Sequence, residues 1–321
     1  MAKALHTLAW VLLLSGAWMA EGARADNPAA PHAEGPVTPP SAASPPPEKP
    51  AAMPRRDADP ESGAMAGNVY GNPYFGLSVP LPPDWSEGLA GPPPSPRGLY
   101  VLSSMDGIKA SRATLLIVAQ DLFFSAKPFA NAADVAADLR ASMASIPDLL
   151  IDREPASITI GGRPFLRLDY HAGGLYRGWL ATELRCHVVI FNITATDQAT
   201  VDHVVDFLGG MSLPALSDAA NGTDADAGHT PGCVKDYVTA QTTVRRVDPV
   251  KVDLNGLTVP VRITVGIDGK VRHVHVISAT PAQRQAIELA LAQWELKPLE
   301  VMGHAAEFET GLSFDFKPRR P

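Results

Sequence analysis

Several histidines and carboxylates of this sequence are candidates for metal binding or acid–base catalysis. His273 and His275 are two residues apart in an alternating stretch, so a strand would place both imidazoles on one face. That spacing can seat a transition metal, with His304 or His229 as a third ligand. Two histidines on a strand are more often surface residues that water solvates, and we favour that interpretation. We therefore predict no metal site and no cofactor.

Two carboxylate–imidazole pairs could act as acid and base, namely Asp169 with His171 and Glu183 with His187. The sequence indicates no third group or oxyanion donor beside either pair. It also lacks Gly-x-Ser-x-Gly, a Walker loop, a dinucleotide fingerprint and His-Glu-x-x-His. We therefore predict that the protein is not an enzyme. A periplasmic hydrolase or metal-binding enzyme, using the concave sheet face of the first domain, is an alternative from another class.

The chain has 2 cysteines, Cys186 and Cys233, and no Cys-x-x-Cys motif. Our hypothesis is that they pair, because the chain looks exported and contains no other cysteine. The disulfide would then stabilise the fold by about 4 kcal/mol in the chain-entropy model. Two separate buried thiols are the other interpretation, and both stay open at this point.

The stretch from Val259 to Phe316 has the clearest pattern of secondary structure. Residues 259–265 alternate apolar and polar as in a half-buried strand, and Asp268-Gly269 favours a tight turn into a second strand over 271–277. Thr280, Pro281 and Gln283 predict a capped helix that Pro298 ends. A final strand over 307–316 alternates again, which predicts one buried face. A small antiparallel ββαβ unit follows from this order.

This stretch resembles the C-terminal domain of TonB-type energy transducers. The resemblance covers about the last quarter of the chain and rests on "VPVRITVGIDGKVRHVHVIS", "AIELALAQWELKP" and "FETGLSFDF". Two features depart from the family. Pro231-Gly232 stands where Tyr-Pro is usual, and Ser278-Ala279-Thr280 replaces Ser-Ser-Gly.

The TonB resemblance implies a docking module that binds an envelope protein or peptide by adding its strand to a sheet edge. The alternative is that the chain itself, or a second copy, covers this edge. The candidate edge strand comprises Glu307, Phe308, Glu309, Thr310, Gly311, Leu312, Ser313 and Phe314. A membrane-anchored energy transducer for outer-membrane transport is the first alternative function.

An earlier domain spans residues 69–214 and alternates strands with two helices. Asn131 and Asp197 are placed to cap the helices, and residues 179–195 form the most hydrophobic strand run. "FGLSVPLPPDW" near the start and "FLGGMSL" at the end resemble the PsbP-like group. This resemblance implies an α/β/α domain on an antiparallel sheet and carries no common chemistry.

Composition and segment order complete the expected organisation. Residues 1–25 resemble a cleaved signal peptide, and residues 26–67 form a Pro-rich disordered tether. A PsbP-like domain over 69–214, a linker over 215–232 and a TonB-like domain over 233–321 follow, which makes an α+β protein of two domains. The formal net charge of -7 argues against nucleic-acid binding. We expect a periplasmic or secreted protein, or an inner-membrane anchored one if the first segment stays uncleaved.

Overall fold

The fold is described from a computed structural model of the chain, which covers residues 58–88, 91–107, 113–214, 231–250 and 258–315. The expected signal peptide and most of the expected tether and linker lie outside these residues. Among the described residues, no helix is long and apolar enough to cross a membrane. Contacts group Ala52 to Pro321 into one compact unit.

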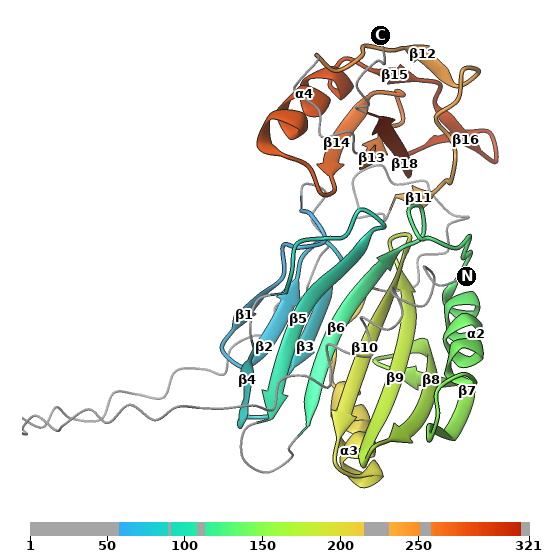
Figure 1. Cartoon of the computed structure of the whole chain (residues 1–321). Helices are drawn as coiled ribbons and strands as arrows, with labels where there is room; N and C mark the ends of the chain where they lie inside the picture. The colour runs from blue at the N-terminus through green and yellow to red at the C-terminus, as the bar shows by residue number, and fades with distance from the viewer. Residues whose placement is uncertain (1–57, 89–90, 108–112, 215–230, 251–257, 316–321) are drawn as a thin grey trace, which may run out of the picture. The chain divides into compact units, whose positions relative to one another are not determined.

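A seven-stranded antiparallel sheet dominates the first half of the described chain (Figure 1). Its strand order is β4-β5-β6-β10-β9-β8-β7. The strands are β4 (Trp85–Glu87), β5 (Leu99–Gly107), β6 (Thr114–Asp121), β7 (Leu150–Ile160), β8 (Arg163–Ala172), β9 (Leu175–Leu184) and β10 (His187–Ala195). The hydrophobic run over 179–195 is thus two central strands, β9 and β10, joined by the two-residue turn Arg185-Cys186.

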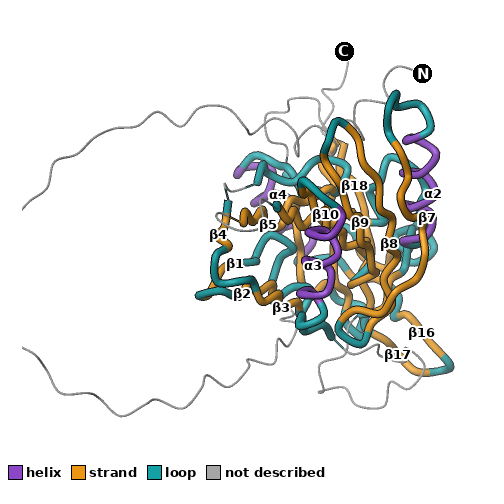
Figure 2. Tube along the Cα trace, turned by 90° about the horizontal axis from the view of Figure 1, so that it is seen from below, coloured by secondary structure: helices purple, strands orange, loops and turns teal. Residues whose placement is uncertain are grey.

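Two helices and a small sheet pack on this large sheet. Asn131 caps α2 (Ala132–Met143) and Asp197 caps α3 (Gln198–Leu208), so both predicted caps are confirmed. Figure 2 shows α2 beside β7 and β8, with α3 lying along β9 and β10. A three-stranded sheet of β1 (Ala64–Ala66), β2 (Val69–Asn72) and β3 (Leu77–Pro80) shares a hydrophobic core with α3.

A second, four-stranded sheet has the order β11-β18-β13-β14. Its strands are β11 (Gly232–Cys233), β13 (Thr258–Val265), β14 (Val271–Val276) and β18 (Phe308–Asp315). Two short pairs accompany it, made by β12 (Thr243–Arg245) with β15 (Glu295–Leu296) and by β16 (Leu299–Val301) with β17 (His304–Ala306). The predicted ββαβ order is present, and the described residues belong to the α+β class.

The helix α4 (Pro281–Leu291) begins with the predicted capping box, in which Thr280 and Gln283 bond to each other's backbone. It ends at Leu291, several residues before Pro298, because the chain turns there to form β15. The turn before β14 also differs from a tight Asp-Gly turn, since only Gly269 has a positive φ, of 76°. A Cβ at Gly269 would lie 2.0 Å from the Leu296 carbonyl oxygen, so this position requires glycine.

The second sheet is buried on both faces around Arg262 and Glu309, which corrects the expectation of one solvated face there. Apolar side chains from β13 and β18 pack with α4 and Trp294 on one side. On the other face, Arg262 and Glu309 are nearly as buried, with exposed fractions of 3% and 1%. They contact residues of the large sheet instead of water. The alternation of apolar and polar residues in β13 and β18 therefore separates an apolar buried face from a charged buried face around Arg262 and Glu309.

Candidate functional site

The candidate site is the side of β18 that faces away from β13. The Glu309 carbonyl oxygen accepts a hydrogen bond from the Val234 amide at 3.0 Å, so the polar backbone groups of Glu309 point away from β13. Because backbone direction alternates along a strand, those of Gly311 and Ser313 point the same way. Pro260 supports this assignment, since it pairs with Ser313 while its carbonyl oxygen accepts from Ile277 on the β14 side.

We call the outward N–H and C=O groups of Gly311 and Ser313 the open side of β18. Among the described residues, β11 pairs with β18 only at Phe308 and Glu309. No strand within that part of the chain pairs beside Gly311 or Ser313. Open backbone groups of this kind can add a strand from another chain.

The structure places the predicted edge strand inside the four-stranded sheet, not at its edge. Its first residues are covered by the chain's own β11, in parallel register with Gly232 opposite Phe308 and Cys233 opposite Glu309. The expectation of an edge running from Glu307 to Phe314 is therefore wrong over its first part. A strand signal alone could not reveal this, because β11 has two residues and no strand pattern of its own.

Two aromatic rings pack on the face of β18 at Gly311. A Cβ at Gly311 would lie 2.8 Å from both the Phe123 Cβ and the Phe124 Cζ, so these side chains press against the glycine. Their rings meet edge to face with centroids 6.4 Å apart. Both are half-buried, so this face of β18 presents accessible apolar surface at Gly311.

Cys186 and Cys233 form a disulfide, with Cα atoms 5.5 Å apart. This resolves the two alternatives that the sequence left open. Cys186 belongs to the turn between β9 and β10, whereas Cys233 belongs to β11. The disulfide therefore fixes the strand that covers the start of β18 to the large sheet.

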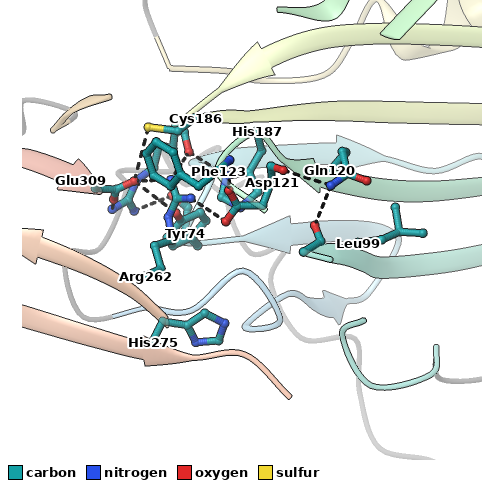
Figure 3. Close-up of polar contacts among 12 residues, drawn as sticks. Tyr74, Leu99, Gln120, Asp121, Phe123, Cys186, His187, Arg262, His275 and Glu309 are labelled. Carbon is teal, nitrogen blue, oxygen red and sulfur yellow. Dashed lines mark hydrogen bonds and ion pairs between the residues drawn. The ribbon is translucent and has the colours of Figure 1, made fainter. Parts of the chain in front are cut away.

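A group of buried charges, which we call the junction cluster, lies beside Cys186 (Figure 3). It consists of Asp121, Arg185, Arg262 and Glu309. Arg262 donates to Asp121 Oδ2 at 2.6 Å and to Glu309 Oε2 at 2.7 Å. Arg185 donates to Glu309 Oε1 and to the Tyr74 carbonyl oxygen. Two cations thus face two carboxylates, and the cluster is electrically balanced where water is excluded.

Burial and paired charge oppose each other within the junction cluster. Burial raises the pKa of Asp121, although the Arg262 charge counteracts it. Burial would also raise the pKa of Glu309, but Arg262 and Arg185 outweigh it and the pKa falls below its ordinary value. The arrangement suits holding two sheets together, because every carboxylate already has a cationic partner.

His187 is fully buried next to the junction cluster. Burial lowers its pKa well below the ordinary value, and the nearby charge of Arg262 adds to the shift. The lowered pKa favours the neutral imidazole, whose Nε2 lies 3.5 Å from Asp121 Oδ2. Glu183, which the sequence offered as its acid–base partner, instead accepts from the Ala132 amide at the start of α2.

The other predicted chemical residues also have structural partners. Asp169 accepts hydrogen bonds from Arg153 and Arg167, while His171 contacts Asp152 at 2.8 Å. The two acid–base pairs considered from the sequence therefore do not form. No group of three or more metal-ligating side chains occurs among the described residues.

His273 and His275 share one face of β14, as the alternation predicts. Both imidazoles approach the carboxylate of Asp59, with His273 Nε2 at 3.0 Å and His275 Nδ1 at 2.9 Å from Oδ1. Glu61 Oε2 lies 3.4 Å from His275 Nε2. The pair thus binds an acidic segment from the beginning of the described chain. His304 lies on exposed β17, and His229 is outside the described residues.

Sequence reasoning missed the junction cluster, because Arg262 and Glu309 occupy the polar positions of alternating strands. Gly311 was the available signal, since a glycine within a strand often marks a close approach by other groups. Opposite charges at neighbouring polar positions were a second signal, but their partners Asp121 and Arg185 are distant in sequence.

The sequence matches no protein-family model and no curated protein. Among solved structures, the chain is similar to cyanobacterial PsbP (CyanoP) from Synechocystis sp. PCC 6803, with 14% identity and a TM-score of 0.35, covering 47% of this chain and 95% of that chain. It is also similar to LpqN of Mycobacterium tuberculosis, described as involved in cell envelope biogenesis. That similarity has 13% identity and a TM-score of 0.28, covering 43% of this chain and 83% of that chain.

Proposed function

We propose that this chain is an exported, non-catalytic protein of the cell envelope that binds an extended segment of another envelope protein. The open side of β18 carries the proposal. Gly311 and Ser313 present N–H and C=O groups there, and no strand in the described part of the chain pairs with them. Strand addition would satisfy these groups, and the half-buried rings of Phe123 and Phe124 would receive an apolar side chain.

The disulfide supports the exported location, since such bonds form and persist in oxidising compartments. The resemblance of the second sheet region to TonB C-terminal domains supports the envelope and the mode of binding. The non-catalytic part of the proposal draws support from the partners of the polar groups. The carboxylates and imidazoles considered for catalysis are engaged in hydrogen bonds or ion pairs within the fold.

Ser313 offers a sharp test, because its N–H points to the open side and not to β13. Ser313→Pro removes that N–H while leaving the hydrogen bonds to β13, and proline is tolerated at such outward positions. Ser313→Ala is the matched control, since it keeps the N–H. Peptides are selected from a random ten-residue library on the full mature, oxidised chain. We expect the selected peptides to bind Ser313→Ala like the wild type and Ser313→Pro about 3- to 10-fold more weakly, the effect of one hydrogen bond.

Equal affinity of the selected peptides for both variants would show that they bind elsewhere, and the proposal would then fail. Circular dichroism and thermal melting of the two variants establish that both remain folded. Failure to select any peptide that depends on residue 313 counts equally against strand addition at β18.

A further inference from the structure

We infer that the Cys186–Cys233 disulfide is a redox-controlled link that keeps β11 on β18, so that reduction by a dithiol lengthens the open side of β18. The effect on partner binding rests on the proposed function. The release of β11 does not, and it can be measured separately.

The link acts on a short strand. Gly232 N donates to the Glu307 carbonyl oxygen at 3.1 Å, and Val234 N donates to that of Glu309 at 3.0 Å. Only Gly232 and Cys233 are in register with β18. A pairing this short depends strongly on what holds its ends in place. Once β11 leaves, the outward groups of Glu309 join those of Gly311 and Ser313.

Reduction is confined to β11 because β18 has a second attachment to the large sheet. Arg185 and Arg262 both bind the Glu309 carboxylate, and neither contact involves sulfur. Breaking the disulfide therefore leaves β18 in place while its cover is freed. The two links come from adjacent residues of one turn, Arg185 and Cys186.

That turn has unusual backbone geometry. Arg185 has φ 45° and Cys186 has φ 61°, both in the left-handed region that favours glycine or asparagine. Two-residue hairpin turns of this kind usually contain Asn-Gly. Non-glycine residues persist in such conformations where the surroundings hold them, and such strain gathers at functional positions. Here both side chains are used, one for the charge link and one for the disulfide.

Cys233 is the more exposed residue of the pair, so we assign the attack to its sulfur. Cys233 is exposed, whereas Cys186 is 6% exposed. A thiolate of a dithiol reductant attacks Cys233 Sγ and forms a mixed disulfide, and Cys186 leaves as a thiolate that takes up a proton. The second thiol of the reductant then releases Cys233 as a thiol. The reductant ends as a disulfide, having supplied two electrons, and the protein ends with two thiols.

Amide hydrogen exchange of the full mature chain tests the release of β11, with dithiothreitol as the reductant. We expect the amides of Gly232 and Val234 to exchange at least tenfold faster after reduction, while those of Val261 and Ile263 in β13 stay protected. The double variant Cys186→Ser with Cys233→Ser should behave like the reduced protein without any reductant. Unchanged protection at Gly232 and Val234 would overturn the inference, and so would faster exchange throughout the second sheet.

Binding of the selected peptides then tests the consequence. Under the inference, reduction strengthens binding severalfold, because Glu309 adds backbone hydrogen bonds to the partner strand. Equal or weaker binding to the reduced protein would overturn the control of access, even if β11 is released. A third outcome is that reduction releases β11 while Ser313→Pro has no effect on peptide binding. That result would reject the proposed function but would still support redox-controlled release of β11.

Discussion

Cys233 lies opposite Glu309 in the parallel pair of β11 and β18, and both residues are bonded to the same turn of the large sheet. Cys233 is joined to Cys186 by the disulfide, and Glu309 is joined to Arg185 by an ion pair. A covalent link and an ionic link thus attach neighbouring strands of one sheet to adjacent residues of another. This arrangement explains why a charged residue in β18 is 1% exposed.

Removing Arg262 should destabilise the fold strongly. Arg262→Met keeps most of the side-chain volume but leaves Asp121 and Glu309 buried with less compensating charge. We expect the free energy of unfolding to fall by about 3–5 kcal/mol, the usual cost of breaking one partner out of a buried ion pair. Urea denaturation followed by tryptophan fluorescence measures the change.

The exposed ion pair of Arg140 with Glu154 provides the control for Arg262. Arg140→Met should leave the unfolding midpoint unchanged within error, since exposed pairs contribute little. A similar effect from both substitutions would contradict a special role for the junction cluster.

His187 should make the protein less stable as the pH falls. Its folded-state pKa is lowered by burial, so below about pH 6.5 the unfolded chain binds a proton that the folded chain does not. The contribution is fully present above the unfolded pKa and declines as the pH falls toward the folded one. The expected slope is about 1.4 kcal/mol of unfolding free energy per pH unit. The charged groups that face the His187 ring are Arg262, Arg185 and Asp121.

The variant His187→Phe tests this assignment, because the ring already packs against Phe75 and Tyr100. Between pH 7 and pH 5, the free energy of unfolding should change less steeply with pH in His187→Phe than in the wild type. The two slopes should differ by up to the amount expected for the uptake of one proton. The same slope in both proteins would assign the proton uptake to another group.

Asp59 should contribute to stability through its contacts with His273 and His275. Burial would raise the pKa of Asp59, but the hydrogen bonds from the two histidines lower it below its ordinary value. A carboxylate with a lowered folded pKa stabilises the fold above its unfolded pKa and loses this effect as the pH falls toward the folded one. Asp59→Asn should therefore cost about 1 kcal/mol at neutral pH, a figure reduced for the partial exposure of the side chain.

The difference between wild type and Asp59→Asn should shrink as the pH drops below about 4, where the unfolded carboxyl becomes protonated. Thermal melting of the wild type and Asp59→Asn across this range provides the measurement. Asp152→Asn serves as a comparison, because Asp152 is an aspartate that contacts a histidine elsewhere in the fold. A difference that stays constant with pH would mean that the asparagine acts through packing and not through lost charge.

Local elements of this protein follow from the sequence by itself. The sequence predicts where α2, α3 and α4 begin, because the side chain of each N-cap residue accepts a hydrogen bond from a nearby backbone amide. These N-cap residues are Asn131, Asp197 and Thr280. Alternation likewise located β13, β14 and β18, because side-chain direction in a strand depends only on position parity.

The groups that cover each face and side of those strands come from distant parts of the chain. The partners of Arg262 and Glu309 come from β6 and from the turn after β9, far away in sequence, so alternation could not distinguish burial against protein from exposure to water. The cover of Phe308 and Glu309 depends on Gly232 and Cys233, a segment too short to have a pattern. A cysteine pair allows a disulfide, but the distance between the two Cα atoms, which determines whether it forms, exists only in the folded chain.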